Sequence, residues 1–164
     1  MAEPTEKGKD SKKTTILVVI AVLLLLGFNF YSFFGASILL PGTELTEISG
    51  INPENNDVSS IDLSKGVVVL NLWATWCPAC IEEMPVFKKA SSRMTVYGAI
   101  KKPFKIEAYR GITPGFKSLV MDDEFFDKLH ISALPTTLLI ENGVIKKVHA
   151  GSVNAEFLND WVRP

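Results

Sequence analysis

Two cysteines separated by two residues are the most chemically active feature of the sequence. Cys77 and Cys80 stand in the run WCPAC at residues 76–80, and the chain has no other cysteine. Thiols at this spacing form half of a metal site or a redox pair. A structural zinc ion needs four ligands, and besides the two thiols the chain offers only His130 and His149. The pattern therefore favours a redox pair, and we expect no metal site and no cofactor.

A redox pair needs one thiol at the amino terminus of a helix and its partner one turn later, both directly after a buried strand. Residues 67–73, VVVLNLW, form a continuous apolar, β-branched run that is typical of a central strand. Pro78 suits the first turn of a helix that begins at the cysteines. The chain therefore predicts the strand and the helix that the two thiols require.

The helix terminus assigns different roles to the two thiols. Unpaired amides and the helix dipole favour a thiolate in the first turn, so we expect Cys77 to be the nucleophile. A thiol pKa lowered from about 8.5 to about 7 raises the thiolate fraction at pH 7 from a few per cent to about half. Cys80, deeper on the helix, is expected to resolve the mixed disulfide by attacking Cys77.

The remaining elements alternate between strand and helix. We expect strands near 95–100 and 116–121, helices near 104–110 and 123–129, a hairpin of strands 136–141 and 144–149, and a last helix over 154–162. The hairpin signal is Asn142-Gly143, because both central positions of such a turn need positive φ. Residues 60–66 are expected to be a helical turn or loop. The expected fold class is α/β, with a central mixed β-sheet flanked by helices.

An uncharged segment before the domain is long enough to cross a bilayer. Residues 14–43 carry no charge, and residues 16–40 are predominantly apolar. Four lysines precede this segment, and no Lys or Arg follows before Lys65, which keeps the amino terminus in the cytoplasm and the domain outside. The alternative is a cleaved signal peptide, for which the small residues 35–37 would supply the cleavage site.

The predicted organisation follows from this anchor. Residues 1–13 are a cytoplasmic segment, 14–40 a transmembrane helix, 41–57 a linker with one short strand near 45–48, and 58–164 the domain. The charges nearly cancel, with 17 Lys and Arg against 18 Asp and Glu, which argues against nucleic-acid binding. The domain would lie in an oxidising compartment, where disulfide chemistry is possible.

Three motifs together resemble the thioredoxin superfamily, and more narrowly the membrane-anchored TlpA/ResA/DsbE-like thiol-disulfide oxidoreductases of bacteria. They are WATWCPAC, EEMP after the second cysteine, and ALPTTLLIENG downstream. The resemblance implies a thioredoxin-like fold in which Pro135 follows a cis peptide bond opposite the cysteines. It implies that Leu134, just before Pro135, presents its backbone to a bound substrate. Trp76, Pro78 and Ala79, which stand next to Cys77, are the other residues that we expect in the substrate-binding rim. It also implies a domain in the periplasm or outside the bacterial inner membrane.

Glu83 lies three residues after Cys80 and so on the same helical face. From the residues alone, a carboxylate early in a helix is favoured by the dipole and needs no catalytic role. The resemblance implies instead that Glu83 tunes the cysteines and transfers protons. Asn71 stands where thioredoxin has a buried aspartate, and an amide cannot accept a proton. We therefore hypothesise that Glu83 replaces that aspartate as proton acceptor for Cys80.

Several functions remain open at this point. The leading one is reduction of disulfides in specific client proteins, for example in cytochrome c maturation, with re-reduction by a membrane electron carrier of DsbD/CcdA type. The motif does not decide direction, so an oxidase or isomerase is the alternative. A Cu(I)-handling module and a non-catalytic interaction domain are further alternatives. Residues 101–113 lack the acidic strand end common in the family and Leu72 stands where Phe is frequent, both of which concern the substrate surface.

Overall fold

The structure is a computed structural model that describes Ile16, residues 18–20 and residues 41–163. Its elements are β1 (Glu47–Ile51), β2 (Val58–Asp62), β3 (Val67–Trp73), α2 (Pro78–Ala90), β4 (Thr95–Lys101), α3 (Ile106–Ile112), β5 (Ser118–Met121), α4 (Asp123–Lys128), β6 (Thr136–Glu141), β7 (Val144–Ala150) and α5 (Ala155–Trp161). No helix within these described ranges is long and apolar enough to cross a membrane. The predicted cytoplasmic segment 1–13 and nearly all of the predicted anchor 14–40 lie outside the described residues.

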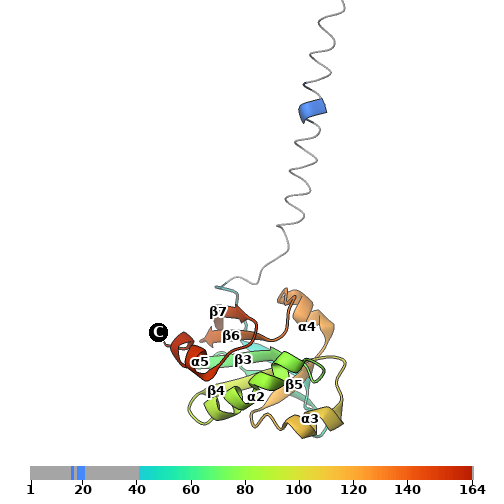
Figure 1. Cartoon of the computed structure of the whole chain (residues 1–164), viewed down its shortest axis with the longest axis vertical. Coiled ribbons are helices and arrows are strands. Elements are labelled where there is room, and N and C mark those ends of the chain that lie inside the picture. The colour runs from blue at the N-terminus through green and yellow to red at the C-terminus, as the bar shows by residue number, and fades with distance from the viewer. Residues whose placement is uncertain (1–15, 17, 21–40, 164) are drawn as a thin grey trace, which may run out of the picture. The chain divides into compact units, whose positions relative to one another are not determined.

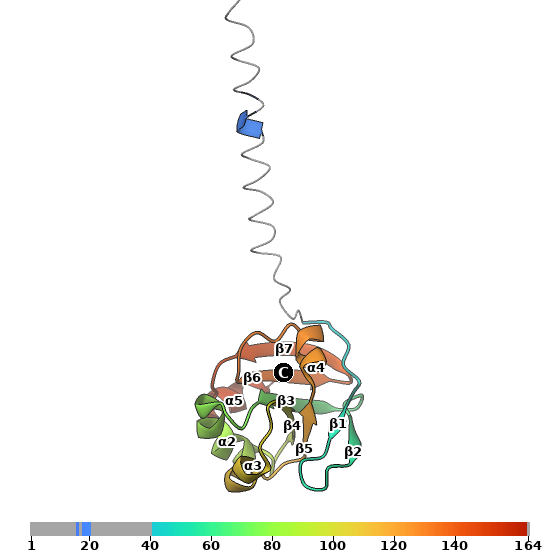
Figure 2. The same cartoon turned by 90° about the vertical axis from the view of Figure 1, so that its right-hand side faces the viewer.

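The strands form one seven-stranded sheet in the order β2-β1-β5-β4-β3-β6-β7 (Figures 1 and 2). β3 pairs in parallel with β4, and β4 in parallel with β5. The remaining pairs are antiparallel, namely β1 with β2, β1 with β5, β3 with β6 and β6 with β7. The predicted α/β class with a central mixed sheet is confirmed.

Two hydrophobic clusters cover the two faces of the sheet, and β3 contributes to both. Val69 and Trp73 belong to the cluster that receives side chains from α2, α3 and α5. Val68, Leu70 and Leu72 belong to the cluster that receives side chains from α4. Successive side chains of a strand point to opposite faces, so the apolar run of β3 is explained by burial on both sides.

The predicted helix near 123–129 and the predicted hairpin are confirmed. The Asp122 side chain accepts a hydrogen bond from the Phe125 amide at 3.0 Å, which caps α4. Asn142 and Gly143 join β6 to β7 with φ of 49° and 78°. The Asn142 side chain also accepts a hydrogen bond from the Gly66 amide at 3.0 Å, which ties the hairpin turn to the start of β3.

Two predictions for the amino-terminal part of the domain are wrong. The short strand expected near 45–48 exists as β1, but the segment 41–57 is not a linker outside the domain, because β1 pairs with both β2 and β5. Residues 60–66 were expected to be a turn or loop, but residues up to Asp62 belong to β2. Before β1, the Leu45 amide donates a hydrogen bond to the Gly143 carbonyl at 2.7 Å. This part of the chain therefore belongs to the sheet.

The reason for the difference is that β1 and β2 have little apolar pattern of their own. β2 has the sequence VSSID and buries only Ile61, because it is an edge strand. The residues between the strands are rich in Asn and Pro, which are turn residues and also linker residues. The pairing of β1 with β5 makes this segment part of the sheet rather than a linker. This pairing joins residues that are far apart in the sequence.

Candidate active site

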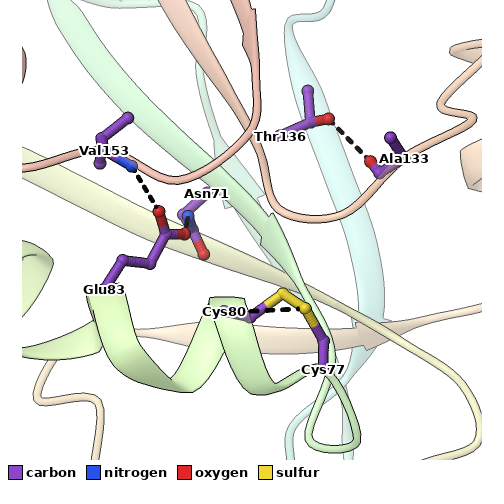
Figure 3. Close-up of a disulfide and its surroundings, with 7 residues drawn as sticks. All are labelled: Asn71, Cys77, Cys80, Glu83, Ala133, Thr136 and Val153. Carbon is purple, nitrogen blue, oxygen red and sulfur yellow. Dashed lines mark hydrogen bonds between the residues drawn. A yellow bond between two sulfur atoms is a disulfide. The ribbon is translucent and has the colours of Figure 1, made fainter.

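Cys77 and Cys80 form a disulfide at the amino terminus of α2, with their Cα atoms 5.3 Å apart (Figure 3). Cys77 is the N-cap residue, and its sulfur accepts a hydrogen bond from the Cys80 amide at 3.2 Å. The side chain of an N-cap residue normally supplies an oxygen to these unpaired amides. Here a sulfur occupies that position, which is the arrangement that the sequence predicted for a reactive thiol.

The local sequence places the Cys77 sulfur by a short turn between β3 and α2. β3 ends at Trp73, and the Cys77 amide donates a hydrogen bond to the Ala74 carbonyl at 3.2 Å. Pro78 then begins α2, where its missing N–H costs no helical hydrogen bond. The buried end of β3 therefore sets the position of the disulfide.

A surface groove of about 430 Å³ opens beside the disulfide. It is lined by the five residues Trp76, Cys77, Pro78, Ala79 and Leu134, together with Lys101, Ile131, Ser132 and Ala133. Half of the Trp76 surface, 51%, is exposed. The structure thus brings all four residues of the predicted substrate rim together around the predicted nucleophile.

The peptide bond between Leu134 and Pro135 is cis, as the resemblance implied. The Thr136 hydroxyl donates a hydrogen bond to the Ala133 carbonyl at 2.8 Å, which closes the loop around this bond (Figure 3). Pro135 itself is buried, whereas Leu134 lines the groove. The backbone before Pro135 therefore shares the groove with Cys77.

Lys101 is a groove residue that sequence reasoning missed. It ends β4, and its ammonium group lies 2.8 Å from the Asp123 carboxylate and 4.5 Å from the centroid of the Phe126 ring. A signal for it existed: β3 and β4 were both predicted strands, and the carboxyl ends of adjacent parallel strands meet at one edge of a sheet. Ile131 to Ala133 had no such signal, because they lie in an irregular loop.

Glu83 is buried, with 3% of its surface exposed, and accepts two hydrogen bonds. The Asn71 side-chain amide donates to Oε1 at 2.8 Å, and the Val153 backbone amide donates to Oε2 at 2.9 Å (Figure 3). Burial raises the pKa of the Glu83 carboxyl above its ordinary value, although the two hydrogen bonds act in the opposite direction. A buried carboxyl with a raised pKa is suited to accept and release a proton.

The carboxylate of Glu83 points toward Asn71 and Val153 rather than toward the sulfurs (Figure 3). Asn71 belongs to the same face of β3 as Trp73, which is the face covered by α2. Its side-chain oxygen has no hydrogen-bond partner among the described residues. Val153 could not be inferred from the sequence, because it lies 70 residues after Glu83 in an irregular segment.

The part of the chain that the structure describes holds no group of three or more His, Cys, Asp or Glu side chains placed to bind a metal ion. The His149 ring packs against α5, with its centroid 4.4 Å from that of Phe157. This placement agrees with a packing role for His149.

Comparison with known proteins gives a consistent set of relatives. The Redoxin family model matches residues 40–98. The thiol-disulfide oxidoreductase ResA of Halalkalibacterium halodurans is 30% identical over 168 residues, which cover 92% of this chain and 91% of ResA. The thiol:disulfide interchange protein DsbE of Tatumella citrea is 33% identical over 104 residues, which cover 59% of this chain and 56% of DsbE.

A solved structure supports the fold. The thioredoxin domain of a thiol-disulfide oxidoreductase from Bacteroides vulgatus matches with a TM-score of 0.60 at 17% identity, over 76% of this chain and 99% of that domain. This similarity shows the thioredoxin-like fold, and the ResA match over nearly the whole length of both proteins shows the family. With its Cys77–Cys80 pair at the start of α2, the chain belongs to the ResA/DsbE-like thiol-disulfide oxidoreductases of the thioredoxin superfamily.

Proposed function

We propose that this protein is a membrane-anchored, extracytoplasmic oxidoreductase that reduces disulfides in specific client proteins, for example in cytochrome c maturation. The observation that carries the proposal is the position of the Cys77 sulfur, which caps α2 and borders a groove shared with Trp76 and Leu134. The resident redox group in this proposal is the cysteine pair alone, without a metal or an organic cofactor.

The proposed reaction begins with the reduced pair. The Cys77 thiolate attacks one sulfur of a client disulfide, that S–S bond breaks, and the second client sulfur leaves as a thiolate and takes up a proton. Cys80 then loses its proton and attacks the Cys77 sulfur, which releases the first client sulfur as a second thiol. The client gains two electrons and two protons, and the protein is left with the Cys77–Cys80 disulfide.

Glu83 is the proposed acceptor of the Cys80 proton. Both residues are buried on α2, so water has little access to either of them. The raised pKa of Glu83 brings its proton affinity closer to that of a thiol than is usual for a carboxyl group. The Asn71 and Val153 hydrogen bonds hold the carboxylate in place in the oxidised state.

The anchor and the electron donor complete the proposal. The uncharged segment 14–43 follows four lysines, and the ResA alignment covers 92% of the chain and thus extends into this segment. A domain held at the outer face of the membrane can be reduced again by a membrane electron carrier of DsbD/CcdA type. Such a carrier would supply the two electrons that each client consumes.

The reduction potential of the Cys77–Cys80 pair tests the direction of the reaction. A reductase is expected to have a potential below about −220 mV, toward that of thioredoxin, whereas a potential near about −120 mV means an oxidant that donates its disulfide. The Cys80→Ser variant is expected to accumulate mixed disulfides with clients, because it cannot resolve them. The matched Cys77→Ser variant should trap none, and trapping by both variants would contradict the assignment of the nucleophile.

A further inference from the structure

The groove beside the disulfide holds a single charged side chain. Of its nine lining residues, only Lys101 is charged, and its neighbours are apolar or neutral. The Asp123 carboxylate and the Phe126 ring hold the ammonium group in place, while 25% of the Lys101 side chain stays exposed. Lys101 therefore places an ammonium group, paired with Asp123, in an otherwise uncharged wall next to Cys77.

A second groove, of about 640 Å³, is bordered by the carboxylate partner of this ion pair, Asp123. Lys101 lines the disulfide groove, and its partner Asp123 lines the second groove. The second groove is mainly apolar and is lined by Ile51, Pro53, Asn56, Lys102, Pro103, Phe104, Val120 and Asp123. The two grooves therefore meet at the Lys101–Asp123 pair.

The residues that line the two grooves carry one more positive than negative charge. Lys101 lines the disulfide groove, and Lys102 lines the second groove together with Asp123, the one carboxylate of the two linings. Within residues 41–163, Lys102 forms no salt bridge of its own. The neighbouring carboxylates line neither groove: Asp122 caps α4, and Glu124 pairs with Lys128.

We propose that this junction recognises a carboxylate side chain close to the disulfide of the client, with an apolar side chain of the same extended segment in the second groove. The inference rests on the proposed function and adds the class of client, namely one with an acidic residue beside its cystine. The Asp123 side chain is 69% exposed, so water weakens its ion pair with Lys101, and the ammonium group can also accept a second carboxylate as partner. Lys102 supplies the additional positive charge that a second carboxylate needs.

Matched peptides test the proposal with the reduced full-length protein in detergent. Three disulfide-bonded peptides differ only in the residue beside the cystine, which is Asp, Asn or Lys, and the rate constant for oxidation of the protein is followed by tryptophan fluorescence. Wild type is expected to react about two- to fivefold faster with the Asp peptide than with the Asn peptide, the size of an exposed charge interaction. The preference should decrease in high salt.

Variants of the two lysines test whether the junction causes the preference for the Asp peptide. Lys101→Met should bring the Asp-to-Asn ratio close to one, and Lys101→Glu should favour the Lys peptide. The ratio cancels any effect of Lys101 on the reactivity of Cys77 itself. Lys89→Met removes an exposed lysine at the far end of α2 and should keep the wild-type ratio. Lys102→Met should also lower the Asp-to-Asn ratio, independently of Lys101.

Two outcomes separate this inference from the proposed function. Equal wild-type rates with all three peptides, or an unchanged ratio in both Lys101→Met and Lys102→Met, would overturn the recognition of acidic clients and leave the redox function standing. Failure of every peptide to oxidise the reduced protein would overturn the proposed function itself.

Discussion

At the scale of single residues, Glu83 and Asn71 form a buried pair that can serve two protonation states. When Glu83 is ionised, the Asn71 amide donates to it, as in this structure. When Glu83 is protonated, it needs an acceptor instead, and the Asn71 side-chain oxygen has no hydrogen-bond partner among the described residues. Rotation of the Asn71 amide would present that oxygen to the protonated carboxyl. This property fits a residue that accepts and releases a proton.

Glu83→Gln is expected to change how stability depends on pH. The pKa of Glu83 is raised in the folded protein, so the ionised carboxyl destabilises the fold relative to the protonated one. The free energy of unfolding of the wild type is therefore expected to fall with rising pH. The fall begins near the pKa of glutamate in the unfolded chain, about 4.3, and continues through the raised pKa of Glu83 in the folded protein. Urea unfolding of the oxidised protein between pH 4 and 8 should show the variant gaining stability relative to the wild type as the pH increases.

The exposed neighbour Glu82 provides the control for this substitution. In Glu82→Gln, the free energy of unfolding should depend on pH as it does in the wild type, because the Glu82 side chain is exposed to solvent in the folded protein as well as in the unfolded chain. In the reduced protein, Glu83→Gln should also shift the titration of the thiols and slow thiol-disulfide exchange. Unchanged thiol pKa values and exchange rates would refute Glu83 as proton acceptor for Cys80, even if its effect on stability were found.

At the scale of elements, the pairing of β1 with β5 is a structural feature that the sequence concealed. Ile48 is the buried residue of β1, with 2% of its surface exposed, and it packs in the cluster on the α4 side of the sheet. Ile48→Ala is expected to lower the free energy of unfolding by about 2 to 5 kcal/mol, through lost burial and the cavity that remains. Denaturant unfolding of the oxidised protein measures this change.

Val58 in β2 is the matched control, since 80% of its surface is exposed. Val58→Ala should change the free energy of unfolding by no more than about 0.5 kcal/mol, as is usual for exposed positions. If residues 41–57 were a linker, both substitutions would have equally small effects. A difference between them thus measures the contribution of this segment to the core.

At the scale of the whole molecule, the uncharged segment determines where the chemistry takes place. The full chain is expected to sediment with membranes and to resist alkaline extraction, because the 25 residues 16–40 are predominantly apolar and long enough to span a bilayer. Protease added from outside should reach the domain in spheroplasts, as the four amino-terminal lysines predict. A soluble mature protein that begins near Ile38 would contradict the anchor and support a cleaved signal.

Local sequence was sufficient where neighbouring residues determine a structure. The cysteine pair and Pro78 mark the start of α2, Asp122 marks the start of α4, and Asn142-Gly143 marks the hairpin. Each of these signals acts through hydrogen bonds or backbone angles within a few residues, so it can be recognised without the fold. β2 gave no such signal, because an edge strand with one buried residue lacks the apolar alternation that marks a strand.

The sequence by itself therefore determined the chemistry of this protein: two thiols one helical turn apart, after a buried strand, with a carboxyl three residues later. Only the tertiary structure decided what surrounds them. Glu83 receives its second hydrogen bond from Val153, and the disulfide groove acquires its charge from Lys101. These contacts join residues far apart in the chain, and their formation depends on sheet register and helix packing, which no local pattern specifies.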